Sequence, residues 1–229
     1  MLALVVAAAG GTLLFFTFTG EDDTTGPNAG PTPGPTSTVQ CDFTPPPAAS
    51  ENKPTFAKAP KNTLKPSETY IAVMETSCGT IELELLAKEA PNTVNSFVFL
   101  ARRKFFDGLT FHRIVKDFVI QGGDPKGDGT GGPGYKTVDK PPDGTTYAAG
   151  DLAMAKAGNE APGTSGSQFF IVTGNPGPLN AQPVYALIGR VVSGLDVAKT
   201  IEQLPAAEGA TDGAPAQPVY INSVRIVVE

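Results

Sequence analysis

The sequence predicts a mainly β domain, a small closed barrel with two helices, behind an apolar N-terminal segment and a disordered, proline-rich linker. Beyond residue 68, short apolar runs alternate with glycine-rich loops, and only two stretches show helical spacing of apolar residues. Ten of the twenty-two prolines lie between residues 20 and 67, where no periodicity survives. Many short strands favour a closed barrel, because closure leaves no exposed sheet edge. We therefore divide the chain into residues 1–20, 21–67 and 68–229.

Composition limits the classes of function. A chain of 229 residues with 40% hydrophobic residues is long enough to bury one sizeable core. The net charge of -6 argues against a nucleic-acid partner, because such proteins bind phosphates through clustered Lys and Arg. One histidine, His112, and two cysteines are too few soft ligands for a structural zinc site. We expect neither a metal nor a cofactor.

The N-terminal segment is apolar and uncharged over residues 2–18. Seventeen residues is the short limit for a membrane-spanning helix. The small residues Ala7 to Ala9 lie too early for a signal-peptide cleavage site. We therefore expect a retained transmembrane anchor, with a cleaved signal and a secreted protein as the alternative. Either way, the domain is expected outside the cytoplasm.

The linker, residues 21–67, is rich in Pro, Thr and Ser. This composition is typical of extended polyproline II segments that form no packed core and act as spacers. Cys41 lies in this segment, and Cys78 lies in the domain that follows. Disulfides persist outside the cytoplasm, so a Cys41–Cys78 bridge and two independent thiols both remain open.

The domain begins with two predicted strands joined through Cys78 and Gly79. Apolar residues alternate with Glu82 and Glu84 along the second strand. The residues expected on the core face are Ile71, Val73, Ile81, Leu83 and Leu85.

An amphipathic helix is predicted from Pro91, with Arg102, Arg103 and Lys104 at its C-terminal end. Cations at that end interact favourably with the helix dipole. A second short helix is predicted at residues 195–203. The apolar runs that we expect as further strands lie at residues 110–115, 118–121, 152–155, 168–172, 184–192 and 219–228.

Two segments carry the chemical information: FFDGLTFHRIVKDFVIQGGD at residues 105–124 and SGSQFFIV at residues 165–172. In sequence, order and separation they resemble the cyclophilin family of peptidyl-prolyl cis-trans isomerases, and the resemblance runs from about Tyr70 to the C-terminus. It implies an eight-stranded antiparallel barrel with two capping helices. It also implies isomerase activity on proline-containing peptides and unfolded proteins, without a cofactor. We expect a monomer.

Arg113 follows an apolar run and precedes more apolar residues, so its charge needs a partner. One interpretation is an ion pair with Asp117 or Asp124. The resemblance implies instead that Arg113 is the catalytic residue. Rotation about an X-Pro bond breaks amide resonance, and a guanidinium can stabilise the twisted amide.

The resemblance also implies a substrate-binding set: Phe118, Val119, Gln121, Ala155, Lys156, Phe170, Leu179 and Tyr185. Phe118, Val119 and Phe170 would hold the proline ring, and Gln121 would orient Arg113. The alternative for the two phenylalanines is ordinary core packing. His112 is expected to pack beside Arg113, because the reaction needs no net proton transfer.

Three departures from the family pattern affect specificity rather than catalysis. Pro178 stands where many members have a tryptophan, which argues against tight cyclosporin binding. Tyr185 stands in the place of a histidine and Lys156 in the place of an asparagine, so the substrate preference is expected to differ. These changes keep a second hypothesis open, a non-catalytic proline-peptide-binding module of the cell envelope.

Overall fold

The computed structural model describes residues 39–229. The predicted apolar segment at residues 1–20 and the first part of the linker lie outside the described residues. Among residues 39–229, no helix is both long and apolar enough to cross a membrane.

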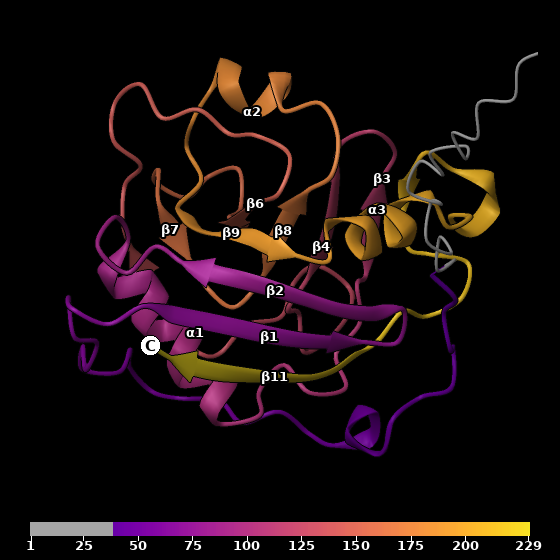
Figure 1. The fold of residues 1–229 in the computed structure, drawn as a ribbon, viewed down its shortest axis with the longest axis horizontal. Helices are drawn as coiled ribbons and strands as arrows, with labels where there is room; N and C mark the ends of the chain where they lie inside the picture. The colour runs from indigo at the N-terminus through magenta and orange to yellow at the C-terminus, as the bar shows by residue number, and fades with distance from the viewer. Residues whose placement is uncertain (1–38) are drawn as a thin grey trace, which may run out of the picture. The chain divides into compact units, whose positions relative to one another are not determined.

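The domain is built on one antiparallel sheet of nine strands, in the order β10-β3-β4-β8-β6-β9-β2-β1-β11 (Figure 1). The strands are β1 (Tyr70–Thr76), β2 (Gly79–Leu85), β3 (Arg113–Val115), β4 (Val119–Gly122), β6 (Asp151–Met154), β8 (Phe169–Val172), β9 (Leu187–Ser193), β10 (Asp212–Gly213) and β11 (Ile221–Val228). A separate two-stranded sheet pairs β5 (Thr137–Val138) with β7 (Thr164–Ser165). The helices are α1 (Pro91–Arg102), α2 (Gly177–Ala181) and α3 (Leu195–Gln203), with 3-10 turns at η1 (Pro47–Ser50) and η2 (Ala207–Gly209).

The sheet curls back on itself, but its strand order is open. All eight strands that the sequence predicts are present, and the ninth strand is the two-residue β10 at one edge. Backbone hydrogen bonds join the segment before β3 to the start of β11: Phe111 donates to Val219 (2.9 Å) and Ile221 donates to Leu109 (2.7 Å). The mainly β fold and the eight predicted strands are therefore confirmed, the described sheet has one strand more, and full closure of the barrel stays a prediction.

The expected core face of β1 was wrong by one residue. In the β1–β2 ladder, Ala72 pairs with Leu83 and Met74 with Ile81, and all four side chains are fully buried in the core. Ile71 instead pairs with Glu84 on the opposite face, and Val73 likewise pairs with Glu82. β1 is apolar at every position from Tyr70 to Met74, so alternation could not set its phase. The tight turn sets the register, and a one-residue shift exchanges the two faces.

The main core contains a group of phenylalanine rings. Phe97 of α1 stacks on Phe106 with ring centroids 4.8 Å apart, and Phe169 of β8 meets Phe106 edge-on at 5.8 Å.

The N-terminus of α1 is fixed by Asp139, whose carboxylate accepts the Thr93 N–H at 2.6 Å. Such a contact satisfies a backbone donor that the first turn of a helix leaves free. The helix predicted from Pro91 is confirmed as α1.

Residues 39–67, which we call the strap, pack against the domain instead of forming the spacer that the sequence predicted. Figure 1 shows this indigo segment running below β11 towards the start of β1. The Phe56 ring contacts the Phe99 ring edge-on at 4.9 Å, and Thr63 N donates to the Asn95 side chain at 3.0 Å. Cys41 and Cys78 are joined as a disulfide. The packed unit therefore extends N-terminal of residue 68, because the strap's few apolar side chains find places on the surface of the core.

Candidate active site

All nine residues that the sequence predicts for catalysis and substrate binding line one hollow of about 230 Å³. They are Arg113, Phe118, Val119, Gln121, Ala155, Lys156, Phe170, Leu179 and Tyr185. They come from β3, β4, β8, α2 and the loops around β6 and β9. Segments more than seventy residues apart in the sequence thus meet at one place.

The alternation of side chains along two neighbouring strands builds this hollow. In β4, Ile120 faces the main core while Val119 and Gln121 face the hollow. In β8, Ile171 faces the main core while Phe170 faces the hollow. Successive side chains of a strand point to opposite faces, so one pair of strands can serve a core and a binding site.

The floor of the hollow is apolar. Val119, Phe170 and Leu179 belong to a small hydrophobic cluster that is separate from the main core. The Phe170 ring meets the Tyr185 ring edge-on, with centroids 5.3 Å apart. Phe170 is therefore both packed and exposed to the hollow, and Phe118 is only partly buried. Ordinary core packing alone does not describe either phenylalanine.

Arg113 lies at the rim of the hollow and is paired with a carboxylate that the sequence analysis did not consider. Its Nε and Nη2 donate to the two oxygens of Asp212 at 2.6 and 2.7 Å, and its Nη1 donates to Gln121 Oε1 at 3.2 Å. The contact with Gln121 is the one that the resemblance implied. The hydrogen bonds to Asp212 raise the pKa of Arg113, and those from Arg113 lower the pKa of Asp212.

The alternative acids for Arg113, Asp117 and Asp124, do not pair with it. The Asp124 carboxylate is buried and accepts the backbone N–H groups of Lys126 (2.8 Å) and Gly129 (2.6 Å). Asp117 lies in the turn between β3 and β4 with a φ of 55°. That interpretation was right about an ion pair and wrong about its partner.

Tyr147 is a second residue that the sequence analysis missed. Its hydroxyl donates to the Tyr185 carbonyl at 2.6 Å and accepts the Tyr185 N–H at 3.1 Å. Burial raises the pKa of Tyr147 to about 12, so the hydroxyl stays protonated at neutral pH. The side chain thereby fixes the backbone of Tyr185 at the edge of the hollow. A single tyrosine in a loop carries no sequence signal for this role.

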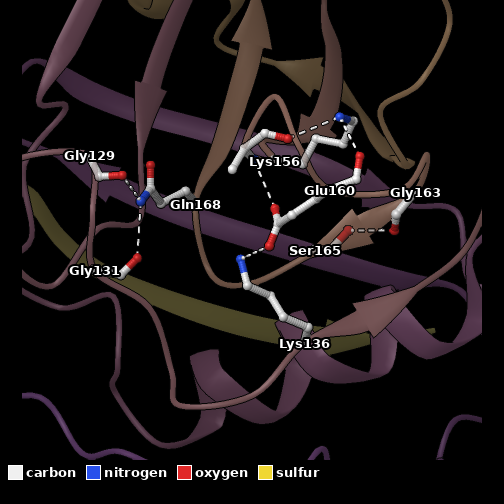
Figure 2. Close-up of polar contacts among 9 residues, drawn as sticks. Gly129, Gly131, Lys136, Lys156, Glu160, Gly163, Ser165 and Gln168 are labelled. Carbon is white, nitrogen blue, oxygen red and sulfur yellow. Dashed lines mark hydrogen bonds and ion pairs between the residues drawn. The ribbon is translucent and has the colours of Figure 1, made fainter.

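A second, polar hollow of about 370 Å³ adjoins the first and shares Gln121, Ala155 and Lys156 with it. Figure 2 shows polar contacts of several residues that line this hollow and of their neighbours. The Gln168 amide donates to the carbonyls of Gly129 (2.9 Å) and Gly131 (3.0 Å). Glu160 forms an ion pair with Lys136 at 3.0 Å. Residues 39–229 contain no group of three His, Cys, Asp or Glu side chains that could hold a metal ion.

His112 lies next to Arg113 in the chain but does not line the hollow. Both of its ring nitrogens are buried and have no hydrogen-bond partner in the described part of the chain. Burial lowers the pKa of His112, against the opposing charge of Asp124. The ring is therefore expected to be neutral at pH 7, which fits packing better than a role as a base.

This depressed pKa predicts a pH dependence of stability. The unfolded chain takes up a proton on His112 below its unfolded-state pKa, about 6.5, whereas the folded chain resists that proton. The free energy of unfolding is therefore expected to decrease as the pH is lowered from 7.5 to 5.5. Because His112 is the only histidine, denaturant titrations from pH 7.5 to 5.5 isolate it. His112→Phe is expected to flatten this dependence. Equal slopes for the variant and the wild type would contradict the prediction.

Comparisons with known proteins agree with this geometry. The family model described as "Cyclophilin type peptidyl-prolyl cis-trans isomerase/CLD" matches residues 71–226. Peptidyl-prolyl cis-trans isomerase B of Bacillus subtilis is 50% identical over 123 residues, which cover 53% of this chain and 82% of the relative. Peptidyl-prolyl cis-trans isomerase A of Mycobacterium tuberculosis is 38% identical over 182 residues, which cover 72% of this chain and 96% of the relative.

Solved structures show the same fold. A cyclophilin-type peptidyl-prolyl cis-trans isomerase of Cryptosporidium parvum, crystallised in the presence of the dipeptide Ala-Pro, matches with a TM-score of 0.60 and 30% identity. The match covers 69% of this chain and 98% of that structure. The family model, the curated relatives and the fold all give one assignment: the chain belongs to the cyclophilin-type peptidyl-prolyl cis-trans isomerase family.

Proposed function

We propose that the chain catalyses cis-trans isomerisation of X-Pro bonds in folding or unfolded proteins, with Arg113 as the catalytic residue. The observation that carries the proposal is the position of Arg113 at the rim of an apolar hollow lined by Val119, Phe170 and Leu179. Uncatalysed isomerisation takes tens to hundreds of seconds, which is slow enough to limit folding.

The reaction requires stabilisation of a twisted amide rather than a nucleophile. Rotation of the peptide bond crosses a barrier of about 18–20 kcal/mol because amide resonance is lost. In the twisted state the proline nitrogen regains a lone pair, and the carbonyl oxygen loses its conjugation with that nitrogen. A hydrogen bond that strengthens as the amide twists lowers the barrier, whereas equal binding of both states does not.

Arg113 has donors available for such a bond. A guanidinium has five N–H groups. Three of them donate to Asp212 and Gln121, which leaves one on Nη1 and one on Nη2. The apolar side chains would hold the proline ring and exclude water, and a hydrogen bond to a charged donor is stronger in such surroundings.

Exchange spectroscopy by NMR tests the proposal. A short Ala-Pro peptide exchanges slowly between its cis and trans signals, and a catalytic concentration of the chain is expected to accelerate that exchange. Peptide binding without acceleration would favour the alternative, a non-catalytic proline-peptide-binding module. If the chain neither binds the peptide nor accelerates its exchange, both hypotheses are contradicted.

We further propose that the domain acts outside the cytoplasm on a membrane anchor. The support is the apolar sequence at residues 2–18 together with the Cys41–Cys78 disulfide, since disulfides persist in oxidising compartments. Fractionation of cells that express the full chain tests this. Recovery in the cytoplasmic fraction with reduced cysteines would contradict it.

A further inference from the structure

We propose that Asp212 is a positioning residue for Arg113: its carboxylate holds the guanidinium so that the remaining N–H groups face the hollow. This inference rests on the proposed catalytic role of Arg113. It adds a residue outside the two segments that carry the family resemblance, on the loop between α3 and β11.

The contact is specific in its geometry. Two parallel hydrogen bonds of 2.6 and 2.7 Å join Nε and Nη2 to the two carboxylate oxygens. A bidentate pair fixes the plane of the guanidinium as well as its position. The side chains are 39% and 50% exposed, and ion pairs at that exposure add little to stability. Orientation is therefore the larger effect of this pair.

The backbone around Asp212 is itself held in place. β10 pairs with β3, so that Asp212 lies opposite Val115 and Gly213 opposite Ile114. The Lys116 N–H donates to the Thr211 carbonyl at 3.0 Å and extends this contact. The carboxylate thus reaches Arg113 from the strand adjacent to the one that carries the arginine, and strand pairing holds the backbone on either side of the contact.

Gln121 restrains the guanidinium from a second strand. Its Oε1 accepts from Arg113, and its Nε2 donates to Gln168 Oε1 at 3.1 Å. Gln168 in turn donates to the carbonyls of Gly129 and Gly131 (Figure 2). Without Asp212, only the single, longer bond to Gln121 would orient Arg113. The side chain would then sample rotamers that turn its free N–H groups away from the hollow.

The kinetic test compares Asp212→Ala with Asp212→Asn. Misplacing a catalytic group is costly, so Asp212→Ala is expected to lower kcat about 10-fold with little change in KM. Asp212→Asn keeps one acceptor oxygen and should retain more activity than the alanine variant. Asp143→Ala is the control, because Asp143 forms an exposed ion pair with Lys140 and does not line either hollow. It should leave kcat unchanged.

A double-mutant cycle separates this inference from the proposed function. If Asp212 acts through Arg113, Asp212→Ala should have no further effect on kcat in the Arg113→Ala background. An inactive Arg113→Ala with a fully active Asp212→Ala would overturn the inference and leave the proposed function standing. A fully active Arg113→Ala would overturn the proposed function itself.

A readout that does not depend on activity completes the test. In NMR spectra of the wild type, the Nε–H of Arg113 should give a slowly exchanging signal, because it donates to Asp212. Asp212→Asn should shift that signal, while Asp143→Ala should not. An unshifted signal would overturn the inference even if the alanine variant were too unstable to assay.

Discussion

Replacing Arg113 with alanine is expected to lower kcat/KM for X-Pro isomerisation by about 10²- to 10³-fold, the loss typical of removing a donor aimed at a transition state. The apolar floor of the hollow, which includes Val119 and Phe170, remains in this variant. The variant should therefore still bind proline peptides, and most of the loss should appear in kcat. Exchange spectroscopy on one peptide, at several peptide concentrations, gives both parameters.

The matched control is Arg190→Ala. Arg190 lies on β9 and forms an ion pair with Asp151 at 3.2 Å, but it does not line the hollow beside Arg113. Arg190→Ala removes the same kind of side chain and the same charge from another strand of the same sheet. Wild-type kcat in Arg190→Ala with a large loss in Arg113→Ala would assign the effect to position rather than to charge. Equal losses would contradict the role given to Arg113.

Arg113→Lys separates charge from shape. Lysine keeps the positive charge but lacks the planar fork that donates to both oxygens of Asp212. The variant is therefore expected to lie closer to the alanine variant than to the wild type in kcat.

The residues of the hollow could be predicted because two short, distinctive segments carry the family resemblance, and the resemblance implied the rest of the set. In the paired strands β4 and β8, successive side chains point alternately into the main core and into the hollow. Once one residue of such a strand is assigned to the hollow, its neighbours are assigned to the core. The loops around β6 and β9 add Lys156 and Tyr185 to the same rim. The mainly β fold and the residues that line the hollow therefore followed from the resemblance that these short segments carry.

What could not be predicted depends on contacts between distant segments. Asp212 is separated from Arg113 by 99 positions, and its segment, ATDGA, looks like a plain turn. The phase of β1 was ambiguous because Tyr70 to Met74 are all apolar. The strap looked like a spacer because proline-rich composition describes local stiffness, whereas Phe56 packs on Phe99 across the surface.

The disulfide is expected to give the largest effect on stability. Cys41 and Cys78 are 37 positions apart, and closing a loop of that size restricts the unfolded chain. The chain-entropy argument gives about 4 kcal/mol of unfolding free energy for such a loop. The double variant Cys41→Ser/Cys78→Ser should lose about this amount in denaturant titrations. Its m-value should also rise, because an unfolded chain without the cross-link exposes more surface.

Phe56→Ala is the control that separates the cross-link from the packing of the strap. It removes the ring that contacts Phe99 in the native state and leaves the disulfide intact, so its m-value should stay that of the wild type. Reducing agent should destabilise the wild type and Phe56→Ala, and leave the double cysteine variant unchanged. Neither cysteine lines the hollow, so the folded double variant should keep the wild-type kcat. Equal free energies of unfolding in water for the wild type and the double variant would show that the cross-link contributes nothing to stability.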